Sequence, residues 1–275
     1  MKAKWIKDIQ YFEELPSTQD YALDLARQGA QGGTLVLAQR QTKGRGRKMN
    51  SWFSPAGGLW FSLILRPGMV PLYIPTLNLG MGLAVVRGVK KITGIPASLH
   101  WPNDIYCRVG LDDSEKKLGG ILVEMEAKGD FLEFVAIGVG LNTNINLDDF
   151  PSVIRERTAS VKNEIGHPID NFSLLEEILN EFERIYAVFK RDGFKPILKD
   201  IKENCSLLGR RVSISDGEER SNRSSREPTF GNSEGIAGWP IEGQSLDIDE
   251  SGALLVRLDS GVVTRILSGR VEVIR

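Results

Sequence analysis

"GGTLVLAQRQTKGRGRKMNSWFSPAGGLWFSLILRP", residues 32–67, joins two apolar segments through a basic loop. The apolar runs at 32–39 and 57–67 have the length and composition of buried β-strands. Between them, residues 41–52, called the basic loop from here on, carry four cations around two glycine spacers: Lys43, Gly44, Arg45, Gly46, Arg47 and Lys48. This order of strand, charged loop and strand predicts a binding site at the edge or rim of a sheet.

The composition of the basic loop predicts that it binds an anion. Glycine at both spacer positions lets backbone N–H groups approach a ligand closely. A solvated basic loop and a nucleic-acid patch are the alternatives. Across the whole chain, 35 Lys and Arg against 36 Asp and Glu give a net charge of −1, which argues against a protein built chiefly to coat nucleic acid. The excess charge is therefore local, and we expect the anion to be small.

The pattern of residues 1–204 predicts an α+β fold, a mixed sheet backed by helices. A strand is expected at 5–12. It is followed by a helix that Ser17 caps and that ends at Gly29.

Three longer segments complete this predicted domain. A core helix is expected at 73–94, and two paired buried strands are expected at 117–127 and 131–144. A longer helix at 171–193 has one apolar face, which we expect to be buried: Phe172, Leu175, Leu179, Phe182, Ile185, Tyr186 and Phe189.

The sequence pattern changes from Cys205 onward, where short β segments are separated by turn residues. This pattern predicts a second domain at 205–275, a small β-barrel of the SH3 type. Within it, a polar tract at about 219–246 is too long for a barrel turn and too polar to bury itself, so we expect a long loop. The run "RSNRSSR" at 220–226 leaves RNA binding open as an alternative for this tract.

Composition excludes several classes of site. No apolar run reaches the roughly 18 residues of a membrane helix, and the N-terminal stretch lacks the apolar core of a signal peptide, so we expect a cytoplasmic protein. Cys107 and Cys205 lie far apart and suggest buried thiols rather than a zinc site or a disulfide. His100 and His167 are too few for a His-rich metal site. The chemistry must therefore rest on Lys, Arg, Asp and Asn.

Four segments, in this order, resemble the biotin protein ligases: "STQ" at 17–19, "QTKGRGRKMNSW" at 41–52, "WPNDIY" at 101–106 with "KKLGGILVE" at 116–124, and "GVGLNTN" at 138–144. The resemblance implies a class II synthetase-like catalytic domain followed by the SH3-like barrel. It also implies an enzyme that uses ATP to convert biotin to biotinyl-5'-AMP. The biotinyl group would then pass to a lysine of a biotin carboxyl carrier protein.

The resemblance assigns site residues, and their chemistry is consistent with this reaction. Biotin's carboxylate and the α-phosphate are both anions, which Arg and Lys neutralise best. The implied catalytic residues are Arg47, Lys117 and Asp104. The implied biotin-binding residues are Ser17, Thr18, Gln19, Gln41, Gly44, Arg45, Gly46, Arg47, Lys117 and Gly120. The implied nucleotide-binding residues are Arg45, Arg47, Trp52, Asn103, Lys117 and Asn142, of which Trp52 offers a stacking face and Asn142 an amide for a base edge.

Asp104 has two functional interpretations. The acceptor lysine must be neutral to attack, yet with a pKa of about 10.4 only on the order of one in a thousand lysines is neutral near pH 7. Asp104 could orient and help deprotonate that lysine, or it could hold Mg²⁺ near the phosphates; the metal ligands stay unassigned. The structural alternative is that Asn103 and Asp104 close the turn after Pro102.

The resemblance also bears on partners and rivals. The short stretch before "STQ" leaves no room for a DNA-binding domain, so we expect the monofunctional type, with no DNA or membrane partner; a homodimer stays open. A lipoate or octanoate ligase of the same superfamily is the nearest enzyme alternative. A noncatalytic nucleic-acid-binding protein is the alternative from another class, and it predicts salt-sensitive binding of oligonucleotides without consumption of ATP.

Overall fold

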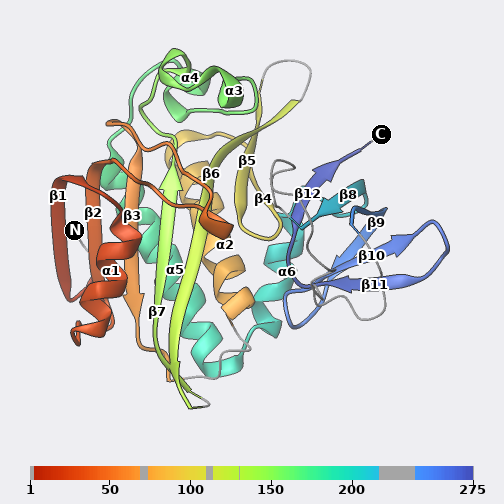
Figure 1. The fold of residues 1–275 in the computed structure, drawn as a ribbon, viewed down its shortest axis with the longest axis horizontal. Helices are drawn as coiled ribbons and strands as arrows, with labels where there is room; N and C mark the ends of the chain where they lie inside the picture. The colour runs from red at the N-terminus through yellow and green to blue at the C-terminus, as the bar shows by residue number, and fades with distance from the viewer. Residues whose placement is uncertain (1–2, 69–73, 110–113, 130, 217–238, 275) are drawn as a thin grey trace, which may run out of the picture.

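The computed structural model describes residues 3–68, 74–109, 114–129, 131–216 and 239–274. Within these ranges the chain forms a seven-stranded mixed sheet with helices on both faces and, toward the C-terminus, a separate five-stranded sheet (Figure 1). No helix of the described part is long and apolar enough to cross a membrane.

The first sheet has the strand order β1-β2-β3-β7-β6-β5-β4, in which β1 and β2 are parallel and all other neighbours antiparallel. Its strands are β1 (Asp8–Leu15), β2 (Thr34–Gln41), β3 (Leu59–Leu65), β4 (Ala97–His100), β5 (Asp104–Val109), β6 (Ser114–Lys128) and β7 (Phe131–Leu141). The helices are α1 (Thr18–Arg27), α2 (Ile74–Thr93), α3 (Ser152–Arg155), α4 (Val161–Ile165), α5 (Asn171–Asp192) and α6 (Lys195–Glu203), with 3₁₀ turns at Arg47–Met49 and Leu147–Asp149.

Alternate residues of the central strands enter two cores on opposite faces. Leu35 and Leu37 of β2 join the larger core, which contains α2 and α5, whereas Val36 and Ala38 join a smaller core with α1. Because both faces are covered, β2 and β3 are continuous apolar runs instead of alternating ones. The predicted mixed sheet backed by helices is confirmed.

The cap of the first helix was predicted correctly, whereas the start of the first strand was not. Ser17 caps α1, as predicted, and its Oγ accepts a hydrogen bond from the Asp20 N–H at 3.2 Å. The strand predicted at 5–12 is wrong in its start, because β1 begins at Asp8. Trp5 precedes the strand and packs on Phe182 of α5, with ring centroids 6.0 Å apart.

The long helix α5 buries the predicted apolar face except for Tyr186, which is partly buried against the core, and Phe172. Leu175, Phe182 and Phe189 are buried, but Phe172 is 59% exposed, so that part of the prediction is wrong. Phe172 lies in the first turn of α5, where its ring contacts Tyr11 of β1 at 6.1 Å instead of entering the core.

The C-terminal sheet comprises the antiparallel strands β8 (Arg211–Ser215), β9 (Ile241–Ile248), β10 (Leu254–Leu258), β11 (Val263–Ile266) and β12 (Arg270–Val273), in the order β11-β10-β9-β8-β12. The predicted small β unit is therefore present. Of the loop predicted at about 219–246, residues 219–238, including "RSNRSSR", lie outside the described ranges. The last part of that prediction is wrong, because Ile241 begins β9. In the first half of β9, small or apolar residues that are buried alternate with polar residues that are exposed. The segment is therefore a half-buried strand although its composition is polar.

The two sheets meet at the end of β4. Trp101 Nε1 donates to Gly252 O at 2.9 Å, and apolar residues of the C-terminal sheet belong to the larger core of the first sheet. The division into domains at 1–204 and 205–275 stays a prediction.

His100, at the end of β4, is a second link between the sheets. Its side chain is buried, and its Nε2 lies 3.0 Å from Val271 O; since a carbonyl can only accept, Nε2 carries the proton. Its Nδ1 lies 3.5 Å from Ser206 Oγ, and its ring stacks on Tyr106 at 4.2 Å.

Burial lowers the pKa of His100 below its ordinary value of about 6.5, because the charged ring would lose its hydration. The bond to Val271 and the charges of Asp104 and Glu115 oppose this shift, whereas the charge of Lys117 adds to it. Between the lowered and the ordinary pKa, the unfolded chain binds the proton more strongly than the folded chain. The stability that the neutral ring contributes is therefore present above about pH 6.5 and lost as the pH falls.

We therefore expect the free energy of unfolding to fall more between pH 8 and pH 5 in the parent protein than in His100→Gln, which has no titrating ring. Urea denaturation of both proteins at the two pH values measures this difference. Equal losses in the two proteins would show that His100 does not contribute to acid sensitivity.

Candidate active site

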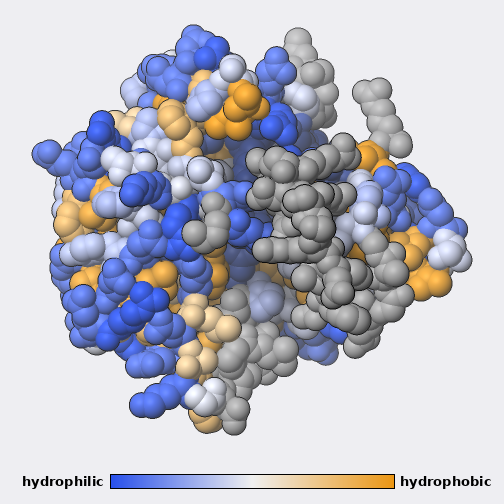
Figure 2. All heavy atoms as spheres, viewed as in Figure 1, coloured by the Kyte–Doolittle hydropathy of each residue, from blue (hydrophilic) through white to orange (hydrophobic). Residues whose placement is uncertain are grey.

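The basic loop crosses the face of the first sheet in front of β7 and β6 (Figure 1). Hydrophilic residues gather over the centre of the same face (Figure 2). The residues predicted for the site come from the start of α1, the basic loop, the start of β5, β6 and the end of β7. The fold thus brings segments that are far apart in the sequence to one end of one sheet.

Thr18 and Gln41 form the first polar cluster of the site. Gln41 Oε1 accepts from the Thr18 N–H at 2.8 Å and lies 3.1 Å from Thr18 Oγ1, while Gln41 Nε2 donates to Ser54 Oγ at 2.9 Å. A Cβ at Gly44 would lie 2.4 Å from Ser54 Oγ, so the loop can pass here only with glycine. Ser17 and Thr18 are buried beside this cluster.

Gln19 is buried and directed at the sheet. Its Nε2 donates to Ala136 O at 3.1 Å, and its Oε1 lies 3.1 Å from Ser62 Oγ, which also lies 3.0 Å from Thr18 Oγ1. Ser62 was missed by the sequence reasoning. The available signal was a single hydroxyl within the otherwise apolar strand "LWFSLIL".

Arg45 is held by two carboxylates that the sequence reasoning did not assign. Its guanidinium pairs with Asp20 of α1 and, at 2.6 Å, with Glu124 of β6. Partial burial opposes the charge, but the hydrogen bonds to Glu124 and Asp20 outweigh it and raise the pKa of Arg45. Arg45 Nε and Glu124 Oε2 are buried and have no hydrogen-bond partner in the described part of the chain. Arg45 therefore fixes the basic loop to α1 and β6.

Arg47 and Lys48 extend the basic loop to the C-terminal sheet. Arg47 Nη1 donates to Asn103 Oδ1 at 2.8 Å and to Gly269 O at 3.5 Å. Burial lowers the pKa of Arg47, against the opposing charge of Asp104. Lys48 Nζ donates to Asp216 O, and Lys48 has a left-handed φ of 53° in the short 3₁₀ turn. The basic loop thus contacts both sheets.

Asp104 and Lys117 form an ion pair on neighbouring strands. Lys117 Nζ lies 2.8 Å from Asp104 Oδ2 and 5.2 Å from the centre of the Trp52 ring. The backbone of Lys117 is bonded on its other side as well, since its N–H donates to Arg157 O and its carbonyl accepts from Ala159 N–H, both at 2.9 Å.

Lys116 belongs to the opposite face. Its register partner in β5 is Cys107, a buried core residue, and its charge acts on Cys107 and Glu164 instead of the site. Alternation along β6 therefore separates the two adjacent lysines.

Two glycines give the Trp52 ring its place against the sheet. A Cβ at Gly140 would lie 2.6 Å from Trp52 Nε1, whereas one at Gly120 would lie 3.6 Å from the ring and 3.3 Å from Asp104 Oδ1. Gly140 was not predicted as a site residue, although it lies in the predicted strand at 131–144. The remaining predicted loop glycine, Gly46, donates its N–H to Asn50 O at 2.7 Å.

Asn103 and Asn142 use their amides within the protein. Asn103 Nδ2 donates to Ile121 O at 3.0 Å, and its Oδ1 accepts from Arg47. Asn142 is buried, and its Nδ2 donates to Ala159 O at 3.1 Å. Each asparagine thus holds a strand end or neighbouring segment in place beside the site, and its role toward a nucleotide stays a prediction.

In the part of the chain that the structure describes, no three His, Cys, Asp or Glu residues are grouped to hold a metal ion by themselves. A single carboxylate, Asp104, lies between Asn103 and Lys117. One carboxylate together with substrate phosphates is a usual donor set for Mg²⁺, so the site fits a metal that arrives with a nucleotide.

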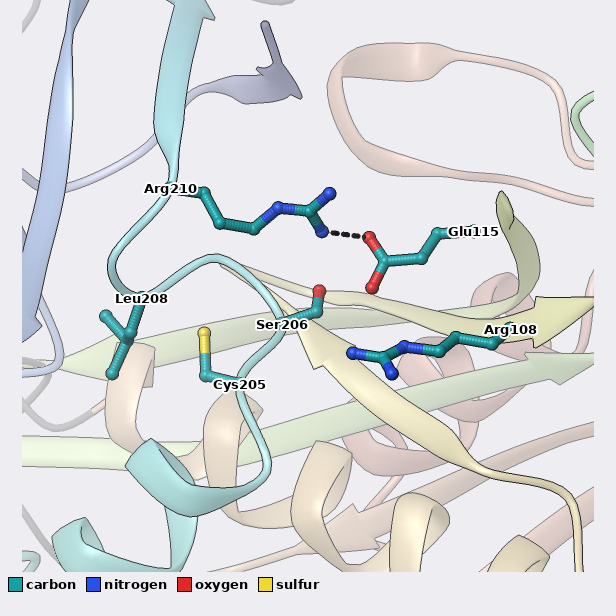
Figure 3. Close-up of a pocket in the computed structure, with 6 residues that line it drawn as sticks. All are labelled: Arg108, Glu115, Cys205, Ser206, Leu208 and Arg210. Carbon is teal, nitrogen blue, oxygen red and sulfur yellow. Dashed lines mark hydrogen bonds and ion pairs between the residues drawn. The ribbon is translucent and has the colours of Figure 1, made fainter. Parts of the chain in front are cut away.

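A cavity of about 410 Å³ lies between the β5–β6 hairpin and the segment leading to β8 (Figure 3). It is lined by Arg108, Glu115, Cys205, Ser206, Leu208 and Arg210. None of these six residues was predicted for the site. Arg210 reaches across the cavity and pairs with Glu115 at 2.5 Å.

Known proteins similar to this chain include biotin ligases. Residues 11–142 match the biotin/lipoate A/B protein ligase family, and residues 235–273 match the biotin protein ligase C terminal domain. The bifunctional ligase/repressor BirA of Bacillus subtilis is 35% identical over 263 residues, covering 95% of this chain and 73% of that protein. The biotin–[acetyl-CoA-carboxylase] ligase of Paracoccus denitrificans is 32% identical over 249 residues, covering 89% and 92%. The structure of a biotin protein ligase from Aquifex aeolicus in complex with biotin and ATP matches with a TM-score of 0.75 and 29% identity, covering 98% and 99%.

Replacing Gly140 with Ala should displace the Trp52 ring, because the added methyl group would overlap the indole nitrogen. We expect stronger acrylamide quenching of the Trp52 fluorescence, identified by its absence in Trp52→Phe, and a loss of about 1–3 kcal/mol in the free energy of unfolding. Gly80→Ala in α2 is the control, since its methyl group would meet only Ile185 Cγ2 at 3.3 Å. Unchanged quenching in Gly140→Ala would contradict the close packing.

Proposed function

Since this chain belongs to the biotin protein ligases of the biotin/lipoate A/B protein ligase family, we propose that it activates biotin with ATP to biotinyl-5'-AMP and transfers the biotinyl group to a lysine of a biotin carboxyl carrier protein. The observation that carries this proposal is Lys117, paired with Asp104 and lying over Trp52 beneath a loop of cations. Biotin-dependent exchange between ATP and pyrophosphate tests it. The match to the biotin-specific C-terminal domain favours biotin over lipoate or octanoate.

The first chemical step brings two anions together, and the cations of the site are arranged to meet them. A carboxylate oxygen of biotin attacks the α-phosphorus of ATP, the bond to the β-phosphate breaks, and pyrophosphate leaves. Lys117 and Arg47 neutralise the charge that gathers between the carboxylate and the α-phosphate. The burial that lowers the pKa of Arg47 also removes water from its guanidinium, which strengthens its attraction for an incoming anion.

The second step transfers the acyl group. The neutral amine of the acceptor lysine attacks the acyl carbon of the adenylate, and AMP leaves with the electrons of the broken bond. Asp104 is the carboxylate at this place, where it orients the incoming amine and favours loss of its proton. Its partner in the structure is Lys117, so the substrate anions would share or replace this pair.

The biotin head is assigned to the cluster at the start of α1. Its neutral urea needs a few hydrogen bonds in an otherwise apolar pocket. Ser17, Thr18, Gln19 and Gln41 supply amide and hydroxyl groups there, and Gly44, Gly46 and Gly120 allow close approach of the backbone. Arg45 contributes by fixing the basic loop through Asp20 and Glu124, in addition to the ligand contact that the resemblance implies.

The nucleotide is assigned to the Trp52 side of the site. The ring offers a stacking face for adenine, and Asn142 keeps its amide oxygen for a base edge while its Nδ2 is bonded to Ala159. Asn103 acts by orienting Arg47. Mg²⁺ is part of the proposal: as the alternative to its role toward the amine, Asp104 would hold the metal, which would neutralise phosphate charge.

The wider assignments are part of the same proposal. A monofunctional enzyme with no DNA partner is part of this proposal, as the Paracoccus relative is named a ligase alone, whereas the Bacillus subtilis relative is named a ligase and repressor. A cytoplasmic location and a homodimer are further parts of this proposal. Salt-sensitive binding of oligonucleotides with no exchange of pyrophosphate would favour the nucleic-acid-binding alternative instead.

Lys117→Ala should slow biotin-dependent pyrophosphate exchange by on the order of 100-fold, because a cation facing two anions is lost. The fold should persist, since the backbone bonds of residue 117 do not need the side chain. Lys116→Ala is the matched control and should exchange at the parent rate. Near-normal exchange in Lys117→Ala would remove Lys117 from the site.

Arg47→Gly should weaken retention of the adenylate more than its synthesis. In this proposal the basic loop covers the reactive mixed anhydride and keeps water from it. Arg47 is a largely buried cation of the loop, and it is bonded to Asn103 beside the site. We expect continued pyrophosphate exchange together with faster release of biotinyl-5'-AMP and untargeted labelling of bystander proteins. If the variant retains the adenylate as long as the parent does, the basic loop is not the lid.

A further inference from the structure

We propose that His100 is a positioning residue that holds β12 as a dock for the basic loop, so that the C-terminal sheet sets how long the adenylate is retained. The identity of the retained molecule, biotinyl-5'-AMP, rests on the proposed function. The docking of the basic loop on the C-terminal sheet does not depend on that function.

Two cations of the basic loop reach the same end of the C-terminal sheet. Arg47 Nη1 donates to Gly269 O at 3.5 Å, and Lys48 Nζ donates to Asp216 O. These two carbonyls flank a register pair of β8 and β12, Ser215 and Arg270. The basic loop is thus bonded to the backbone of the turn that begins β12 and to the residue that follows β8.

The position of Gly269 is determined by close packing. A Cβ there would lie 2.6 Å from Ile214 Cγ2 and 3.0 Å from Ser215 O, so only glycine lets the turn lie this near β8. A shift of the turn would therefore move the carbonyl that receives Arg47.

His100 fixes the same strand from the first sheet. Its Nε2 donates to Val271 O, two residues beyond Gly269, at 3.0 Å. Its ring stacks on Tyr106, which is the register partner of Lys117. One side chain therefore joins the strand that docks the basic loop to the strand pair that carries the proposed catalytic lysine.

The residues around His100 show what the hydrogen bond to Val271 adds to the packing of β12. The cavity of about 410 Å³ shown in Figure 3 lies near His100, whereas Val271 of β12 packs in the larger core. Ser206, which lies 3.5 Å from His100 Nδ1, lines that cavity, and the pair of Arg210 and Glu115 crosses it. Core packing of Val271 attaches β12 to the first sheet, and the directional hydrogen bond from His100 to the Val271 carbonyl fixes where the backbone of the strand lies.

A matched pair of substitutions separates the hydrogen bond from the packing. His100→Phe keeps a planar ring for Tyr106 but removes the donor to Val271, whereas His100→Gln keeps an amide donor. We expect both variants to exchange pyrophosphate within about twofold of the parent, and His100→Phe to release biotinyl-5'-AMP about tenfold faster, as loss of one buried hydrogen bond allows. His100→Gln should release it at nearly the parent rate. Equal release from His100→Phe and the parent, or equally fast release from both variants, would overturn the proposal.

Limited trypsin digestion measures the docking of the basic loop independently of biotin activation. Cleavage after Arg47 and Lys48 should be faster in His100→Phe than in the parent and in His100→Gln. If the parent shows no pyrophosphate exchange, the proposed function fails, but this digestion still decides whether His100 holds the dock. Protection of the basic loop in His100→Phe equal to that in the parent would refute the docking role.

A second variant covers the case in which His100→Phe does not fold. Gly269→Ala displaces the docking turn without changing the histidine, and its added methyl group meets a side chain of β8. We expect the same faster release and faster cleavage of the basic loop, with pyrophosphate exchange retained. Ser268→Ala, one residue earlier and exposed, is its control. Parent-like release and cleavage in Gly269→Ala would overturn the proposal.

Discussion

The antiparallel register of β5 and β6 is the constraint on which the site depends. It pairs Tyr106 with Lys117 and Asp104 with Gly120, which directs the lysine and the carboxylate to the same face and joins them at 2.8 Å. A slip of one residue would turn Lys117 into the core and bring Lys116 to the site. The irregularity between Ile105 and Tyr106 is where the register is adjusted, so a local feature of one strand determines which charges meet.

Much of the fold could be predicted because it follows from local patterns. Continuous apolar runs gave β2 and β3, and helical spacing gave α2 and α5, since these signals need only the residues of one element. Failures occurred where tertiary packing decides. Phe172 fits the helical face by spacing but lies at the end of α5, against Tyr11. The strand β9 contains glycine, serine and charged residues, and only its central position in the C-terminal sheet makes it regular.

The candidate site was predictable in its segments and less so in its partners. Resemblance selected Lys117, Asp104, Trp52 and the basic loop, and the fold brings them together. The resemblance could not show that Arg45 is held by Asp20 and Glu124. These carboxylates come from a helix and a strand, and the distance between the two depends on how the whole sheet is assembled. The same limit applies to the amides of Asn103 and Asn142, which are engaged by backbone carbonyls.

The backbone of Lys117 is bonded to the sheet on one side and to residues 157–159 on the other. Its main chain is therefore bonded on both sides, although its side chain ends at the candidate site. When substrate anions arrive, the ammonium group can leave Asp104 by rotation about side-chain bonds, with no segment to reorganise. Such rotamer changes take picoseconds to nanoseconds, far faster than loop movements. The exchange of partners at Lys117 is therefore expected to be too fast to limit a catalytic cycle.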